Sequence, residues 1–235
     1  MSQQFGLDRL RAVSYLVILT ACGHGATPPT APAPDPTVPW PVAAGWASET
    51  APVGYRLLRF RWLFNDGQAS VGGQGSARLA APDSMRFDIA GPLGIGAAAA
   101  VVVGEDPQWV APPEIIARLI PSYPLMWAMF AVMRPPPIGA RVRGARSDSA
   151  TALEWAQGAD TVRYRLPRAG PGPFRAEWQR AGVTMGIVET KLDAAGAPVS
   201  SRLTVPSVPA RLDLTIVLDS LPGAFAPDVW APPRR

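Results

Sequence analysis

Alternation of apolar and polar residues dominates the chain from Gly54 onward. In residues 55–64 every second side chain is large and apolar, with arginines between them, and residues 211–218 repeat the pattern. A period of two is typical of β-strands that bury one face. This part of the chain therefore predicts strands with a core side and a solvent side.

Turn signals separate these segments at intervals of about ten residues, which is typical of an antiparallel sheet or barrel. Asn65-Asp66-Gly67 predicts a hairpin turn. Three glycines in the next strand, at 72, 73 and 75, predict a bend or a close backbone approach. We expect a mainly β (α+β) fold with about ten or eleven antiparallel strands.

Two helical segments interrupt the strands. Residues 113–120 begin with a proline, which suits the first turn of a helix. Residues 124–133 are apolar all round, so we expect a helix that is buried or that lines an apolar cavity. An ordinary core helix and a lid over a lipid cavity both remain open.

The N-terminal residues predict export and lipidation. Arg9 and Arg11 precede a short apolar run that is too short to cross a bilayer as a helix, and the run ends in Leu19-Thr20-Ala21-Cys22. This pattern resembles the bacterial lipobox, which implies a signal peptide over residues 1–21 and a lipid on Cys22. Two or more acyl chains hold a protein stably on a membrane. The glycine after Cys22 suggests the outer membrane.

Residues 22–53 are expected to form the lipidated end and a proline-rich tether. Seven prolines lie between residues 26 and 42, a composition that favours extended chain. At about 3 Å per residue, some fifteen residues reach on the order of 45 Å. We expect Trp46 to pack on the folded domain, which is assigned to residues 54–235.

Composition argues against an enzyme. Charged residues make up only 17% of the chain, and the net charge of +4 comes from scattered arginines without a run of the nucleic-acid type. One cysteine and one histidine, His24, are too few for common metal sites or for a triad outside the tether. Gly91, Gly94 and Gly96 lie between strands rather than before a helix, so a dinucleotide site is rejected. We expect no cofactor, no metal and no catalytic residue.

The segment Arg86-Phe87-Asp88-Ile89-Ala90-Gly91-Pro92-Leu93-Gly94, together with a central helix from Pro124 to Trp127, resembles the LolB family of lipoprotein receptors and its carrier relative LolA. The resemblance implies an incomplete antiparallel β-barrel that is covered by helices and encloses a cavity for acyl chains. It also implies a membrane-insertion loop at Pro92, Leu93 and Gly94. The implied cavity or lid residues are Phe60, Trp62, Leu125, Met126, Trp127, Met129, Phe130 and Met133.

The family has a helix before its first strand, and residues 43–54 are too short and too rich in flanking Pro and Gly to predict a comparable one.

The resemblance leaves two candidate functions. The first is a monomeric, lipid-anchored receptor on the periplasmic face of the outer membrane, which binds acyl chains or lipoproteins and accepts them from a LolA-like carrier. The second is a structural or partner-binding lipoprotein with the same fold and no transfer role.

Overall fold

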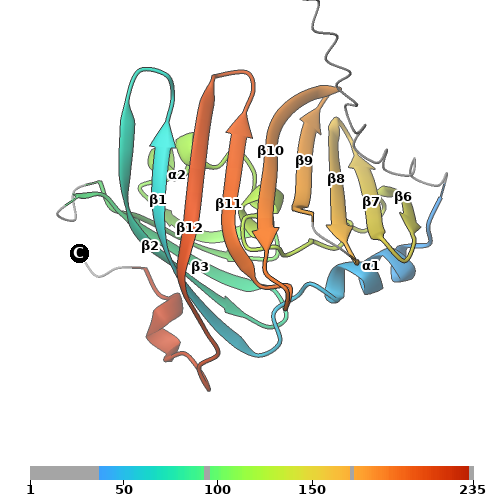
Figure 1. Ribbon diagram of the computed structural model, residues 1–235, viewed down its shortest axis with the longest axis horizontal. Coiled ribbons are helices and arrows are strands. Elements are labelled where there is room, and N and C mark those ends of the chain that lie inside the picture. Colours follow the sequence, from blue (N-terminus) through green and yellow to red (C-terminus); the bar gives the residue numbers. More distant parts are fainter. Residues whose placement is uncertain (1–36, 93–95, 170–171, 233–235) are drawn as a thin grey trace, which may run out of the picture. The chain divides into compact units, whose positions relative to one another are not determined.

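A single antiparallel sheet dominates the computed structural model, which describes residues 37–92, 96–169 and 172–232 (Figure 1). Twelve strands occur within these ranges, and their order in the sheet is β5-β4-β3-β2-β1-β12-β11-β10-β9-β8-β7-β6. The strands are β1 (Tyr55–Asn65), β2 (Ser70–Ala80), β3 (Ser84–Ala90), β4 (Ala98–Val103), β5 (Asp106–Ala111), β6 (Arg141–Arg146), β7 (Ala150–Gln157), β8 (Asp160–Pro167), β9 (Phe174–Arg180), β10 (Val183–Leu192), β11 (Pro198–Val205) and β12 (Ala210–Ser220).

The sheet is open, because β5 and β6 lie at opposite ends of the strand order. In Figure 1 the strands from β12 to β6 form the near wall, while β2 and β3 turn away behind it and α2 lies behind β1 and β12. The expected mainly β, incomplete antiparallel barrel is confirmed. The described residues hold twelve strands instead of ten or eleven, since both six-residue edge strands pair along their length.

The predicted hairpin and the glycine-rich strand are confirmed. Asp66 caps the β1–β2 turn by accepting hydrogen bonds from the backbone of Gln68 and Ala69. In β2, a β-carbon at Gly75 would lie 2.4 Å from the ring of Phe60. The absence of a side chain at Gly75 therefore lets a large aromatic ring lie flat on the inner face of the sheet.

Helices α2 (Pro113–Leu119) and α3 (Tyr123–Ala128) cover the inner face, where α2 contacts β4 and β5 and α3 contacts β9 and β10. The helix expected over residues 124–133 is shorter than predicted. Ala131 has a left-handed backbone with φ of 61°, and three prolines follow at 135–137. Both features oppose helix continuation, so the apolar residues after Ala128 are buried as irregular chain.

A helix that the sequence does not predict, α1 (Trp40–Ser48), lies before the first strand. Its Ala43 and Ala47 are buried one turn apart, and Trp46 packs against Gly144 of β6. The expectation that no such helix precedes the first strand is wrong, because burial against β6 stabilises a segment whose local sequence is a weak helix former. The expected packing of Trp46 on the domain is confirmed.

The C-terminal residues cover part of the outer face of the sheet. The short 3-10 helix η2 (Pro227–Trp230) lies beside β3 and β5, where Trp109 donates to the Trp230 carbonyl at 2.8 Å. Phe225 meets both Tyr55 and Trp230 edge-on. This strap covers the outer side of β3 and β5 and the start of β1, and it leaves the outer sides of the rest of β1 and of β6–β12 uncovered by described residues.

Candidate functional site

The inner face of the sheet beneath α3 is filled by the protein's own side chains. Phe60 of β1 stacks on Phe87 of β3 with ring centroids 5.5 Å apart, and Phe130 completes the cluster at 5.9 and 6.2 Å from them. Such aromatic pairs stabilise a core beyond their buried area. This packing leaves the region beneath α3 as solid core.

A buried polar contact ties α3 to the sheet. The Thr190 hydroxyl of β10 donates to the Ala128 carbonyl at 2.8 Å and also bonds the Ser201 hydroxyl at 2.9 Å. Ala128 is the last residue of α3, where carbonyls lack partners within the helix. The Ala128 carbonyl also accepts the Ala131 amide at 2.9 Å, so the Thr190 hydroxyl is its second donor and fixes the position of the helix end on the sheet.

A buried arginine, Arg134, holds the chain after α3 against the β4–β5 turn. The Arg134 guanidinium lies over the Trp127 ring at 4.7 Å, and the Trp127 indole donates to the Gly104 carbonyl at 2.8 Å. Burial lowers the pKa of Arg134 and raises the pKa of the neighbouring Glu105 carboxyl. These contacts join the irregular segment 129–137 to the β4–β5 turn.

A cavity of about 710 Å³ opens at the end of the sheet where β1 begins and β12 ends; we call it the mouth cavity. Its wall is made by the residues after α1, by the end of β8 and by the β10–β11 hairpin, and Phe130 forms part of its lining. The apolar residues that line it are Ala51, Pro52, Val53, Phe130, Ala131, Leu166, Pro167, Leu192, Ala195, Ala197 and Leu221.

Two of these residues are notable because water reaches them. Val53 is 93% exposed and Leu221 is 76% exposed. Val53 precedes β1 and Leu221 follows β12, and these strand ends are paired, with Leu57 opposite Ser220. An apolar ligand in the mouth cavity would cover both of them.

Ion pairs form the polar part of the rim. Arg146 donates to both carboxylate oxygens of Glu49, at 2.9 and 2.7 Å, and Arg168 donates to the same carboxylate at 3.4 Å. The hydrogen bonds from Arg146 hold the pKa of the Glu49 carboxyl below its ordinary value. Arg56 pairs with Asp219 across the β1–β12 boundary. A ligand with an apolar chain and a polar head would meet both kinds of surface here.

The structure describes the expected cavity or lid residues, and it places them together in the core. Leu125, Met126, Trp127 and Met129 are fully buried, and Phe60, Trp62 and Met133 are nearly so. Of that set, Phe130 lines the mouth cavity. Cys22, Leu93 and Gly94 lie outside the described residues, and Pro92 is exposed at the end of the described part of the β3–β4 connection.

The ion pairs of the rim have no signal in the sequence. Glu49 and Arg146 lie 97 positions apart in the chain, and Arg56 and Asp219 lie 163 positions apart. No local pattern connects such pairs, because each partner lies in a separate segment of ordinary polar composition. The central pairing of β1 with β12 is the one structural fact that would have placed Arg56 beside Asp219.

Carboxylates on the outer face of the sheet do not form a catalytic pair. Glu154, Glu177 and Glu189 each bind arginines on neighbouring strands, and Asp88 lies between Arg78 and Arg86. Within the described ranges, no group of three His, Cys, Asp or Glu side chains is placed to hold a metal ion. In the same ranges, no helix is long and apolar enough to cross a bilayer.

Comparison with known proteins identifies the architecture. No family model and no curated protein sequence matches the chain. Among solved structures, it is similar to a LolA superfamily protein from Nitrosomonas europaea, with 14% identity and a TM-score of 0.54 over 82% of this chain and 96% of that one. The fold is a LolA-like open β-barrel.

A second similar structure is a putative outer membrane lipoprotein-sorting protein domain from Vibrio parahaemolyticus. The identity is 8% and the TM-score is 0.53, over 81% of this chain and 95% of that one. At such identities, the likeness concerns the LolA-like fold alone.

Proposed function

We propose that the chain is a lipid-anchored envelope protein that binds acyl chains of lipids or lipoproteins in the mouth cavity, on the periplasmic face of the outer membrane. The mouth cavity is the observation that carries this proposal. Its volume of about 710 Å³ falls within the range of small-molecule sites, and its lining is largely apolar. Two proteins of similar structure, one named for lipoprotein sorting and one as a member of the LolA superfamily, support the same class of ligand.

The physical basis of binding would be burial of apolar surface, worth roughly 25 cal/mol per Å². Phe130 and Leu192 offer such a surface inside the mouth cavity, and exposed Leu221 extends it to the rim. The arginines that pair with Glu49 would remain near the polar head of the ligand. Such binding needs no catalytic group.

Delivery of a lipoprotein to the membrane is a further part of the proposal. Cys22 would carry the anchor, and the β3–β4 loop would carry Leu93 as the residue that enters the bilayer. The last pair of β3 and β4 before this loop is Ile89 with Ala98, so the loop starts from a paired strand end. A LolA-like carrier would supply the lipoprotein.

A second function, a partner-binding lipoprotein without a transfer role, is favoured by the packed interior. Phe60, Phe87 and Phe130 occupy the space beneath α3, which an acyl chain would need if it were to enter deeply. In this second case the mouth cavity would receive a protein segment.

Native mass spectrometry of the full chain purified from bacterial membranes separates the two functions. We expect a noncovalent lipid or acylated peptide that is lost on denaturation, unlike the acyl groups on Cys22. Leu221→Arg should remove that ligand, whereas Val183→Arg, at another exposed site where β10 begins, should retain it. A ligand-free wild-type protein would reject the acyl-binding function and leave the partner-binding one.

A further inference from the structure

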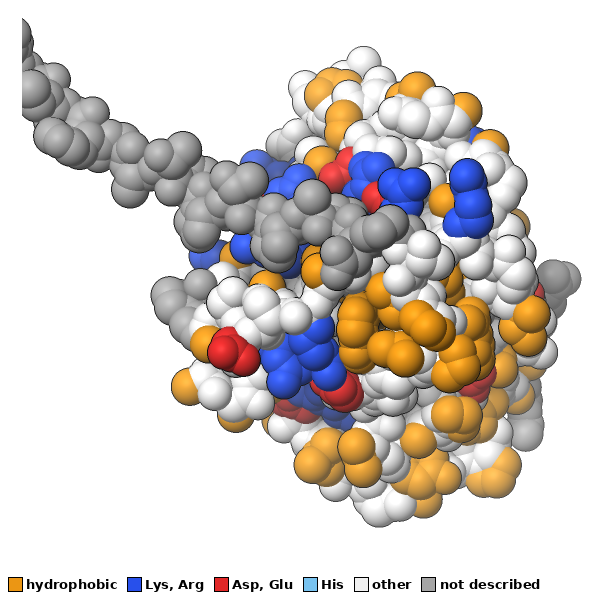
Figure 2. Space-filling model, turned by 90° about the vertical axis from the view of Figure 1, so that its right-hand side faces the viewer, with side chains coloured by type: hydrophobic (Ala, Val, Ile, Leu, Met, Phe, Trp, Pro, Cys, Tyr) orange, Lys and Arg blue, Asp and Glu red, His pale blue; other side chains and the backbone are white. Residues whose placement is uncertain are grey.

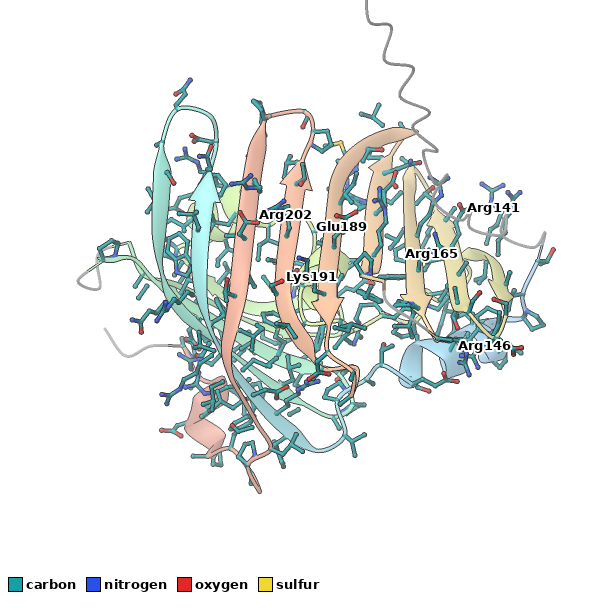
Figure 3. The ribbon with its side chains drawn as sticks, in the orientation of Figure 1. Arg141, Arg146, Arg165, Glu189, Lys191 and Arg202 are labelled. Carbon is teal, nitrogen blue, oxygen red and sulfur yellow. The ribbon has the colours of Figure 1, made fainter. Side chains whose placement is uncertain are left out.

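The outer face of the sheet carries more cations than carboxylates. Along the uncovered half, outward side chains of neighbouring strands form continuous rows, one of which runs through Arg143, Glu154, Arg163 and Glu177. Figure 3 places Arg141, Arg165, Lys191 and Arg202 along the strands from β6 to β12. We call this surface, made by the outward side chains of β1 and β6–β12, the outer face.

Every carboxylate on the outer face already has a cation. Arg163 bonds Glu154 and lies within 4.0 Å of Glu177, and Arg175 bonds Glu189 at 2.6 Å. Asp213 binds both Arg202 and Arg211, at 2.6 and 2.7 Å. These exposed pairs add little stability, but they neutralise all the negative charge of the outer face.

The remaining cations of the outer face have no ion-pair partner among the described residues. They come from four strands, and all but Arg165 are exposed, so they produce a positive potential across the face. Figure 2 views the β6 side of the molecule and shows Lys and Arg side chains in several groups there. The cations without a partner are Arg59, Arg61, Arg141, Arg143, Arg165 and Lys191.

One row of the outer face has cations and hydroxyls without any carboxylate. Arg61 lies opposite Thr215, Thr215 opposite Ser200, and Ser200 opposite Lys191. A shallow groove of about 420 Å³ lies beside this row and is lined by both hydroxyls and by Lys191. Glu189 and Asp213 also line it, and each of these carboxylates is already paired with an arginine. Arginine, lysine and hydroxyl donors together suit phosphate oxygens.

Exposed aliphatic side chains lie among these cations. Leu63, Val217 and Leu218 point outward at 43%, 56% and 42% exposure, and Leu218 lies directly opposite Arg59. Cations combined with exposed aliphatic groups are typical of surfaces that rest at a membrane interface, where charge attracts anionic lipid and apolar groups enter the headgroup region. A nucleic acid would give no reason for the aliphatic part.

We propose that the outer face docks on a bilayer surface that contains anionic phospholipid headgroups. The segment that leads toward Cys22 leaves the folded unit beside the cations of β6. The Val38 amide donates to the Val142 carbonyl at 3.1 Å, and Val142 lies between Arg141 and Arg143. A lipid on Cys22, which is part of the proposed function, would hold this side of the outer face near the membrane. The docking itself is a property of the outer face and does not require the anchor.

Flotation of the full chain with Cys22→Ala on vesicles tests the proposal, because this variant lacks the acyl groups. The vesicles are phosphatidylcholine, with or without phosphatidylglycerol, at low and high salt. We expect binding to the anionic vesicles that falls with salt, and a loss of about tenfold with Arg61→Glu plus Lys191→Glu. The apolar N-terminal segment contributes equally in every variant, so the difference reports the outer face.

A matched control is Arg118→Glu plus Arg180→Glu, which changes the net charge equally at exposed positions away from the outer face. We expect this pair to leave vesicle binding within about twofold of the Cys22→Ala chain. If both double variants lose vesicle binding equally, net charge alone explains the loss and the proposal is overturned. Equal binding to neutral and anionic vesicles would overturn it too, as would no binding at all, the result expected for an acidic protein partner. Ligand retention in native mass spectrometry reports the mouth cavity separately, and the outer-face pair should leave it unchanged.

Discussion

A β-carbon at Gly186 would lie 2.5 Å from Cδ1 of Leu125, so the side chain of α3 rests directly on the backbone of β10. Leu125 is fully buried at this contact. The approach brings α3 close enough for the Thr190 hydroxyl to reach the Ala128 carbonyl. The packing of the central helix therefore depends on a residue without a side chain.

Gly186→Ala should destabilise the fold by about 1–3 kcal/mol, because the added methyl forces Leu125 out of its position. Thermal unfolding followed by circular dichroism measures the change. Gly45→Ala in α1 is the control, since a β-carbon there meets no heavy atom within 4 Å, and it should stabilise the protein by about 0.5–1 kcal/mol. Equal melting temperatures for Gly186→Ala and the wild type would refute the close contact.

Phe130→Ala should join the mouth cavity to the core. Removal of the ring destabilises the fold by about 3–5 kcal/mol, and it leaves apolar space behind the mouth where an acyl chain can enter. We expect tighter binding of a fluorescent fatty acid. Phe174→Ala removes an equally buried ring that does not line the mouth cavity, so it should destabilise without a gain in affinity. The same affinity in both variants would mean that Phe130 does not close the mouth.

The Glu49–Arg146 pair should make stability depend on pH. Because the pKa of the Glu49 carboxyl is lowered in the folded state, its stabilisation is present above the ordinary value of 4.5 and is lost as pH falls through the folded value. The melting temperatures of wild type and Glu49→Gln should differ at pH 7 and converge near pH 3. Glu114→Gln is the control, because Glu114 forms no ion pair with a described residue, and its difference from wild type should not follow this course. A constant Glu49→Gln difference across the range would exclude the pair as the cause.

Leu93→Glu should abolish transfer of a lipoprotein into liposomes and leave the melting temperature unchanged, since a charged tip opposes entry into the bilayer. Val103→Glu places the same charge at the exposed opposite end of β4 and should transfer normally. A wild-type rate for Leu93→Glu would reject the insertion loop.

Cys22→Ala should remove the lipid and loosen membrane attachment, so that a high-salt wash, which also weakens binding through the outer face, releases more of this variant than of the wild type. Mass spectrometry of the purified chain measures the acyl groups directly. An acylated form of this variant would show that the anchor lies elsewhere in the chain.

The sequence by itself determined the strands, the β1–β2 turn and the antiparallel class. These features follow from local periodicity: apolar side chains alternate along 55–64, and Asn65-Asp66-Gly67 supplies the turn. The close approach at Gly75 was also predictable, since an interior glycine in a strand marks such contacts.

Only the tertiary structure decided where α1 and α3 begin and end and where the mouth cavity lies. Ala43 and Ala47 become a buried helix face because β6 is beside them. Ala131 has a left-handed backbone that few alanines adopt, so the apolar run continues beyond α3 without continuing the helix. The rim joins Glu49 to Arg146 through contacts distant in sequence, which no local pattern encodes. Local periodicity thus specified the strands, whereas long-range packing determined the site.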